Sequence, residues 1–259
     1  MISSGYITMF FTTKGLVIRT ADWREGDRIL TVMTEDRGKL SMKAPGVRRK
    51  NSKLGPAGQL FAYGNMTVYE NGGHHTLQDF ESLEQFYKLS ADLDALALAS
   101  YFCELLSTEG EEDLPAPGML RLALNSLYAL ANHLFPDRQI KACFELRFLA
   151  ITGYEPDLWR CAACGAQPED PLVALEQGRL YCADCRAAAR GKTMRLNRAA
   201  LQAARYVLRC DLKKLFSFRV EDADLRLLGD FAEAYLLTRL ERGFRTLDFY
   251  HSLQVGDAT

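Results

Sequence analysis

Four cysteines in two close pairs form the clearest candidate metal site in the sequence. The pairs are Cys161-Ala-Ala-Cys164 and Cys182-Ala-Asp-Cys185, and seventeen residues separate them. Cysteines three positions apart on a tight turn can direct both sulfurs at one point, and two such turns supply four thiolates at about 2.3 Å from a zinc ion. Gly165 follows Cys164, where a turn with positive φ favours glycine.

A four-thiolate site has no open coordination position, so the pattern predicts one structural zinc ion and no catalytic metal. A mononuclear iron site and a redox dithiol are the alternatives, although a redox dithiol needs only one pair. The other three of the seven cysteines, Cys103, Cys143 and Cys210, fit small buried hydrophobic residues. The odd count in a chain with no export signal argues against a disulfide framework.

A second chemical feature is a run of cations without acidic residues. Residues 38–55 contain no Asp or Glu, and their cations are Lys39, Lys43, Arg48, Arg49, Lys50 and Lys53. Clustered Lys and Arg attract phosphates by long-range charge and by counterion release. The run therefore predicts phosphate binding on a loop that leaves a strand, with a solvated surface as the alternative.

Aromatic residues near this run are candidates for stacking on bases, namely Trp23, Phe61, Tyr63 and Tyr69. Aromatics on alternating strands are more often core residues. A second basic set lies C-terminally and consists of Arg195, Arg198, Arg205, Arg209, Lys213 and Lys214. Arg198, Arg205 and Arg209 are expected on one side of a helix, which leaves open both a solvated face and a share in the binding site.

The predicted secondary structure changes from strands to helices near residue 85. Before it, five β-rich runs separated by Gly-containing turns are typical of a small barrel or sandwich. These runs are expected at 16–22, 29–34, 39–44, 59–69 and 74–80. In the third run Leu40, Met42 and Ala44 alternate with polar residues, which predicts one buried face.

After residue 85 the apolar period becomes helical. Five helices are expected: one from about residue 93, one at 117–134, one from Asp137, one near 197–209 and one at 223–242. Ser90 and Asn197 are the expected N-caps of the first and fourth helices, and Gly153 is the expected C′ glycine of the third. Residues 108–117 form an acidic connection, and 249–259 are expected to fray. The fold class is α+β, with a domain at 1–85 and another at 86–259 that contains a zinc module at 158–190.

Composition limits the function classes. The chain has 259 residues, 48% of them hydrophobic and 25% charged, with a net charge of −1, so it is globular and no polycation. Its uncharged stretches are too short or too polar to span a membrane, and its start lacks the basic region of a signal peptide, which favours a cytoplasmic protein. No GxxxxGK[ST], GxGxxG after a strand, HExxH or GxSxG motif is present, so we expect no enzyme.

Four stretches occur in an order that is more specific than any one of them. Thr13–Ile18 precedes Gly26–Leu30, then comes Lys43–Arg49 with Ser52, and Gly153–Leu158 leads into the first cysteine pair with Gly165. In this order they resemble the bacterial RecO family of DNA repair and recombination mediators, over about residues 13 to 245.

The resemblance implies an N-terminal oligonucleotide-binding (OB) barrel, a helical domain and an inserted zinc module. RecO-like proteins bind single- and double-stranded DNA and anneal complementary strands without ATP. They contact the acidic C-terminal tail of single-stranded DNA-binding protein and, with RecR, help load RecA onto coated strands, in the cytoplasm near the nucleoid. By this resemblance the residues that contact the DNA backbone would be Arg19, Arg28, Lys39, Lys43, Arg48, Arg49, Lys50 and Lys53.

Two other function classes compete with this one. A zinc-bearing module that only bridges proteins would lack intrinsic annealing activity. A nuclease or deaminase would need a metal site with an open position, and the deaminase pairing of PCxxC with HxE is absent.

Overall fold

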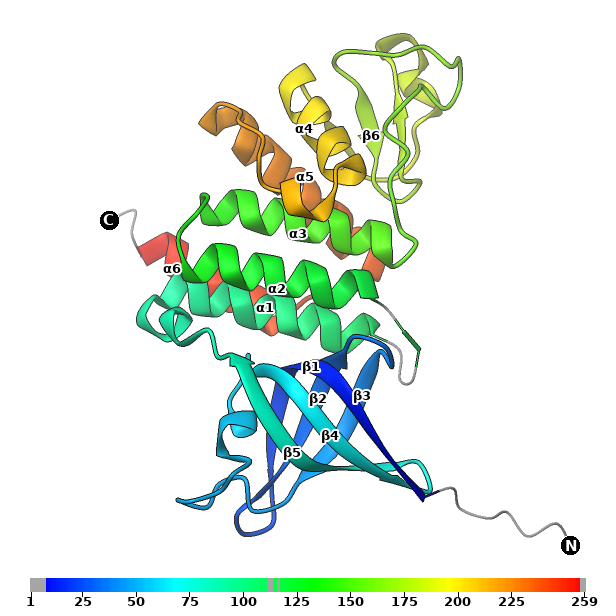
Figure 1. Cartoon of the computed structure of the whole chain (residues 1–259). Coiled ribbons are helices and arrows are strands. Elements are labelled where there is room, and N and C mark those ends of the chain that lie inside the picture. The colour runs from blue at the N-terminus through cyan, green and yellow to red at the C-terminus, as the bar shows by residue number, and fades with distance from the viewer. Residues whose placement is uncertain (1–7, 111–113, 116, 257–259) are drawn as a thin grey trace, which may run out of the picture. The chain divides into compact units, whose positions relative to one another are not determined.

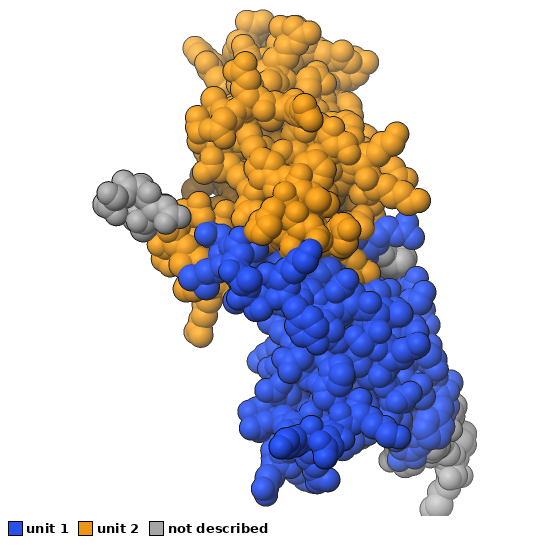
Figure 2. Space-filling view, turned by 60° about the vertical axis from the view of Figure 1, so that its left-hand side comes forward, with its two compact units in different colours: residues 1–123 blue, residues 124–259 orange. Residues whose placement is uncertain are grey.

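The chain divides into two compact units, residues 1–123 and 124–259, which are coloured separately in Figure 2. The computed structural model describes residues 8–110, 114–115 and 117–256. Figure 1 labels the helices α1–α6 and the strands β1–β6. Within the described part of the chain, no helix combines the length and the apolar character that crossing a bilayer requires.

The first unit is built on a closed barrel of five strands in the order β1-β2-β3-β5-β4. Neighbouring strands are antiparallel except β3 and β5, which pair in parallel. The strands are β1 (Thr8–Trp23), β2 (Asp27–Thr34), β3 (Lys39–Ala44), β4 (Tyr63–Asn71) and β5 (His74–Glu84). This OB-like barrel, followed by helices, confirms the predicted α+β fold class.

The barrel forms because apolar side chains recur at every second position and so share one face of each strand. In β3, Leu40, Met42 and Ala44 are buried, as predicted from their alternation with polar residues. The barrel interior is filled by side chains from all five strands, mainly Val17, Leu30, Val32, Leu40, Met42, Met66, Val68, Leu77 and Phe80.

Three strands differ most from the expectation, and one of them is β5, which continues to Glu84 and not only to residue 80. The first is longer than predicted, because β1 pairs with both β2 and β4 and bends at an irregularity between Val17 and Arg19. The fourth begins at Tyr63 and not at residue 59, because a 3₁₀ turn, η1 (Gly55–Gly58), precedes it. Phe61 then has a φ of +68°, which interrupts extended backbone.

A helix packs against the barrel within the first unit. After η2 (Tyr87–Ala91) comes α1 (Leu93–Glu109), and Asp92 is its N-cap. The Asp92 carboxylate accepts hydrogen bonds from the N–H groups of Asp94 and Ala95 at 2.9 and 3.1 Å. The predicted cap, Ser90, is wrong: its hydroxyl donates to the Tyr87 carbonyl in the preceding turn. The next helix, α2 (Pro117–Ala131), ends before the predicted residue 134, and His133 has a φ of +48°.

The expected acidic connection at 108–117 is only partly tested. Thr108 and Glu109 belong to α1, which is therefore longer than predicted. Residues 111–113 and 116 lie outside the described residues.

The second unit combines helices with a small sheet. Its helices are α3 (Asp137–Ile151), α4 (Arg198–Arg209), α5 (Asp222–Leu240) and α6 (Arg245–Gly256), with short turns η3 (Ala183–Ala188) and η4 (Leu212–Lys214). The sheet has the order β7-β6-β8 and consists of β6 (Leu172–Ala174), β7 (Arg179–Tyr181) and β8 (Thr193–Arg195). Two predicted helix ends are confirmed. Gly153 follows α3 with a φ of +87°. Asn197 caps α4, because its side-chain oxygen accepts a 2.9 Å hydrogen bond from the Ala200 N–H.

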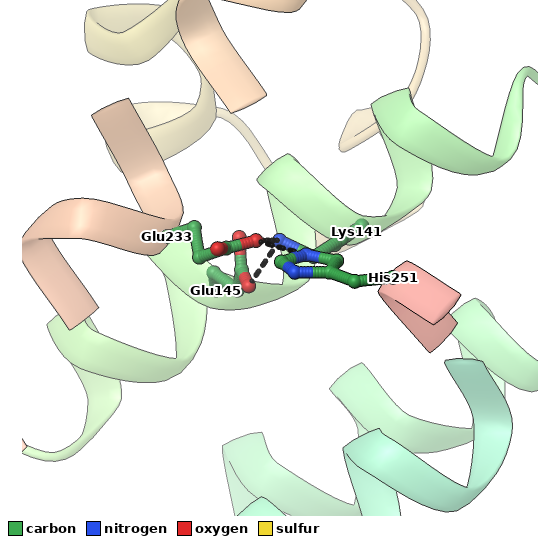
Figure 3. Close-up of polar contacts among 4 residues, drawn as sticks. All are labelled: Lys141, Glu145, Glu233 and His251. Atoms are coloured by element: carbon green, nitrogen blue, oxygen red, sulfur yellow. Dashed lines mark hydrogen bonds and ion pairs between the residues drawn. The ribbon is translucent and has the colours of Figure 1, made fainter. Parts of the chain in front are cut away.

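A buried ion-pair cluster joins three helices of this unit (Figure 3). Lys141 of α3 lies 2.7 Å from Glu145 on the same helix and 2.6 Å from Glu233 of α5. His251 of α6 lies 3.0 Å from the same Glu233 carboxylate. The expectation that residues 249–256 fray is therefore wrong, because α6 is held by a long-range contact; residues 257–259 lie outside the described residues.

The charge on Lys141 is what makes this cluster stable. Burial alone would lower the pKa of Lys141, but the carboxylates of Glu145 and Glu233 outweigh it, and the pKa is raised overall. Glu145 is fully buried and needs this cation, because an uncompensated buried charge is costly.

Replacing Lys141 by methionine should lower the free energy of unfolding by about 3–5 kcal/mol, since it leaves the Glu145 carboxylate buried without its cation. Urea denaturation followed by circular dichroism would measure this. The matched variant Lys141→Met with Glu145→Leu removes both charges and should recover most of the loss. Equal stability of the wild type and the single variant would contradict this account.

Candidate metal centre and nucleic-acid surface

The two cysteine pairs meet in one cluster in the second unit. The four sulfurs of Cys161, Cys164, Cys182 and Cys185 all lie within 4.8 Å of one another. Four thiolates in tetrahedral order around a metal at 2.3 Å are about 3.8 Å apart. The Cys164 and Cys182 sulfurs are 3.7 Å apart, so the arrangement fits a metal ion of this size.

Local backbone structure places each pair. The Gly165 N–H donates to the Cys161 carbonyl at 2.9 Å and closes the first turn, where Gly165 has the predicted positive φ of +76°. Cys182 directly follows β7, and its N–H points at the Cys161 sulfur from 3.4 Å. The Cys185 N–H closes the second turn by donating to the Cys182 carbonyl at 3.1 Å. The small sheet therefore brings together two turns that are distant in sequence.

The pKa values of thiols in this cluster are shifted in opposite directions. Burial alone would raise the pKa of Cys161, but N–H groups of Cys182, Cys164 and Ala163 donate to its sulfur and lower the pKa to about 6. Hydrogen bonds to Cys182 and Cys164 raise the pKa of Cys185 to about 12. A backbone hydrogen bond from Ala166 alone would lower the pKa of Cys164, but hydrogen bonds to Cys161 and Cys182 raise it overall. The Cys161 thiol is therefore the most easily deprotonated of these three, whereas Cys164 and Cys185 must lose protons to become ligands.

The remaining cysteines are separate from this cluster. Cys103 and Cys143 are buried, as predicted for small hydrophobic residues, and burial raises the pKa of each thiol. Cys210 is only half-buried, beside the guanidinium of Arg147. No other group of His, Cys, Asp or Glu within the described residues has the geometry of a metal site.

The basic loop, residues 45–54, is fixed to the turn between β1 and β2. The Gly46 N–H donates to the Asp27 carboxylate at 2.6 Å, and the Arg48 N–H donates to the Gly26 carbonyl at 2.9 Å. Val47 and Leu54 of the same loop are buried in the barrel core. The loop is thus anchored by hydrogen bonds and by its apolar side chains, and its cations occupy defined positions.

Arg48 and Arg49 lie on the outer side of this anchored loop and are exposed. Arg48 lies 3.1 Å from Asp22, whose carboxylate also accepts a 2.9 Å hydrogen bond from Arg28. The hydrogen bond from Arg28, with the charge of Arg48, lowers the pKa of Asp22. One carboxylate thus positions two guanidiniums without neutralising both.

The Arg49 side chain crosses two glycines of the loop and the turn. Gly26 and Gly46 have φ angles of +86° and +64°, which favour glycine. A Cβ on either would lie 3.4–3.5 Å from the Arg49 side chain. This is ordinary contact distance, so it is the positive φ angles, which let both backbone segments turn tightly, that favour glycine at these positions.

Other predicted cations lie on the outward face of the barrel strands. Arg19 of β1 pairs with Thr31 of β2, and Lys43 of β3 pairs with Thr76 of β5. A cavity of about 190 Å³ lies along this face and is lined by Lys39, Lys43, Gly73, His74 and others. His74 was missed from the sequence, because nothing in it shows that β5 pairs with β3. Lys50 and Lys53 are exposed in the basic loop.

Two of the eight predicted DNA-contacting cations donate to main-chain carbonyl groups inside the first unit. Arg28 donates to the Gly58 carbonyl at 2.5 Å, and Lys39 donates to the Ser107 carbonyl near the end of α1 at 2.9 Å. Both add to the local positive field. Their side chains also hold η1 and α1 in place, so removing either would disturb the fold.

The predicted aromatic candidates divide by exposure. Phe61 is 4% exposed and belongs to the core, which removes it as a surface for bases. Tyr63 and Tyr69 are half-buried, and the Tyr69 ring packs against that of Phe10 with centroids 5.0 Å apart. Trp23 is 45% exposed at the end of β1.

The C-terminal arginines share one side of α4, as expected, and have partners there. Arg205 donates to the carbonyls of Leu158 and Trp159 at 2.8 and 3.2 Å, and Arg209 lies 2.8 Å from Glu155. They hold the segment that leads into the cysteine cluster. Arg198 lies 3.3 Å from Glu169 and remains largely exposed. Trp159, against this face, was not singled out from the sequence.

The chain is therefore a protein of the OB-like barrel class, with an anchored basic loop on the barrel and with helices after it that carry a four-cysteine cluster. Family models for the N-terminal and C-terminal parts of recombination protein O match residues 9–86 and 90–248. The chain belongs to the RecO family of DNA repair proteins.

Relatives are similar over nearly the full chain. The DNA repair protein RecO of Acetivibrio thermocellus is 32% identical over 246 residues, which cover 94% of this chain and 97% of the relative. That of Desulforudis audaxviator is 35% identical over 252 residues, which cover 96% and 99%. The predicted family resemblance is confirmed.

The acidity of the cluster predicts proton release on metal binding. At pH 7, zinc should displace at least two protons per ion, because four thiolates are needed and the pKa values of the Cys164 and Cys185 thiols are raised, that of Cys185 to about 12. Calorimetry in buffers of different ionisation enthalpy would count them. Affinity should fall as pH falls, since protons then compete for the sulfurs.

Cys164→Ser should weaken zinc binding strongly, whereas Cys103→Ala, outside the cluster, should leave the affinity unchanged. Zinc binding without proton release, or equal affinities for the two variants, would contradict this account of the cluster.

Proposed function

We propose that this chain is a recombination mediator that binds single- and double-stranded DNA on its barrel and anneals complementary strands without ATP. The observation that carries the proposal is the basic loop anchored to Gly26 and Asp27, which keeps Arg48 and Arg49 exposed in fixed positions. Membership of the RecO family supports it.

The chemistry of annealing fits such a surface. Two DNA strands repel each other through their phosphates, and a surface that neutralises both lowers this barrier and raises the local strand concentration. Contacts to phosphates carry no sequence information, so binding should be tolerant of sequence. The proposed backbone-contacting residues that are exposed are Arg19, Lys43, Arg48, Arg49, Lys50 and Lys53.

The metal of the four-cysteine cluster is, we propose, one structural zinc ion. Cys161, Cys164, Cys182 and Cys185 would hold it with no position left for substrate, and no step of annealing passes through it. Its contribution is to hold together two turns in a module with few other constraints.

The partners proposed here follow from the family. They are RecR, the acidic tail of single-stranded DNA-binding protein and, indirectly, RecA, which this protein would help load onto coated strands. The proposed location is the bacterial cytoplasm, near the nucleoid.

The test is annealing of two complementary labelled strands precoated with single-stranded DNA-binding protein, without ATP. Arg48→Ala with Arg49→Ala should slow pairing about tenfold, because two phosphate contacts are lost. The matched control is Arg219→Ala with Arg226→Ala, which removes two exposed arginines of the second unit and should pair strands at the wild-type rate. Arg28 is not used, since it also holds Gly58.

The possible outcomes separate the function classes. No pairing by folded, zinc-loaded wild type would favour a bridging module that only joins proteins. A marked preference for base sequence would contradict backbone binding, and turnover of DNA by the pure protein would indicate an enzyme.

A further inference from the structure

Trp159 in the second unit lies among cations and is partly open to solvent. The guanidinium carbons of Arg205 and Arg209 lie 5.5 and 5.3 Å from the centroid of its ring. Trp159 is 37% exposed although it carries a large apolar ring. A large aromatic left exposed beside two cations is a feature that burial in a core does not explain.

The position of this ring is set by its neighbours. Arg205 donates to the carbonyls of both Leu158 and Trp159. The backbone N–H of Trp159 donates to the Asp157 carboxylate at 3.3 Å. Arg205 and Arg209 lie one turn apart on α4, so both guanidiniums reach the ring from the helix side. The ring is therefore held beside two guanidiniums while more than a third of the residue stays exposed.

The charge around the ring favours a polyanion. Residues 155–210 contain nine basic and six acidic residues, an excess of three positive charges, and two of these acidic residues, Glu155 and Asp157, contact Arg209 and the Trp159 backbone. Four thiolates around a divalent ion would cancel two of the three positive charges. Arg160, next to Trp159 in the chain, is exposed, and Arg209 is 58% exposed although it lies beside Glu155.

An exposed indole with exposed guanidiniums beside it matches the needs of one nucleotide in a single strand. The base has a π-face that stacks on an aromatic ring, and its phosphates are attracted to neighbouring cations. An acidic peptide would satisfy the cations but would leave the ring without a stacking partner.

We propose that Trp159 is a stacking platform for an unpaired base, with Arg160 and Arg209 contacting the flanking phosphates. The proposal rests on the proposed DNA binding and adds a second contact point in a different unit from the basic loop. A base held on Trp159 is withheld from pairing until a complementary strand competes for it.

The chain has two tryptophans, one in each unit, which makes the test specific. Trp23→Phe leaves Trp159 as the sole tryptophan, and its fluorescence is followed as a thymidine oligonucleotide is added. Stacking should quench the emission. An abasic oligonucleotide of equal length, which supplies phosphates without bases, should bind but quench much less, and poly-glutamate should not quench.

Anisotropy of labelled DNA measured on the same Trp23→Phe protein separates the two proposals. Binding without quenching would overturn the stacking role and leave the proposed function standing. No binding at all would overturn both. Equal quenching by the abasic strand or by poly-glutamate would show that charge alone acts at this site.

Substitution of Trp159 provides the second test. Trp159→Leu should weaken binding of single strands about tenfold, whereas Trp159→Phe, which keeps an aromatic face, should retain most of the affinity. Zinc content and the far-ultraviolet circular dichroism spectrum of both variants report whether the module is folded. Equal affinity of folded Trp159→Leu and wild type would overturn the proposal.

Discussion

The closure of the barrel between β3 and β5 is the constraint on which the proposed nucleic-acid surface depends. Only Met42 with His75 and Lys43 with Thr76 make this parallel pairing. Because β5 lies between β3 and β4 in the closed order, the chain cannot connect β3 to β4 by a short hairpin. It needs a long connection across the end of the barrel, and this connection is the segment that carries the cations. The strand order thus determines where the positive charge lies.

The same residue types have two uses in the first unit, and burial separates them. Arg28 and Lys39 donate to carbonyl groups of η1 and α1, so their charges also hold the fold. Arg48 and Arg49 extend from a backbone that is already hydrogen-bonded, and their side chains stay exposed. A surface whose cations are fixed before DNA arrives loses less conformational entropy on binding than a flexible loop would.

Local patterns were sufficient to predict most of the elements and the four-cysteine cluster. The alternation in β3, the spacing of Cys161 to Cys185 and the Asn197 cap each depend on a few neighbouring residues, and the structure has them as expected. The failures depend on contacts between distant residues. The helix at 245–256, whose second half was expected to fray, is held by the contact between His251 and Glu233. Periodicity does not report such contacts. For the same reason the position of Trp159 beneath Arg205 was missed.

The most direct measurement is the salt dependence of the affinity of the wild-type protein for a single-stranded oligonucleotide. Six exposed cations of the first unit, each neutralising one phosphate, predict a slope of about −4 for log K against log salt concentration, at about −0.7 per contact. A slope of this size or steeper would support binding by the fixed positive surface. A slope near zero, with measurable affinity, would contradict it, because binding would then not depend on phosphate neutralisation.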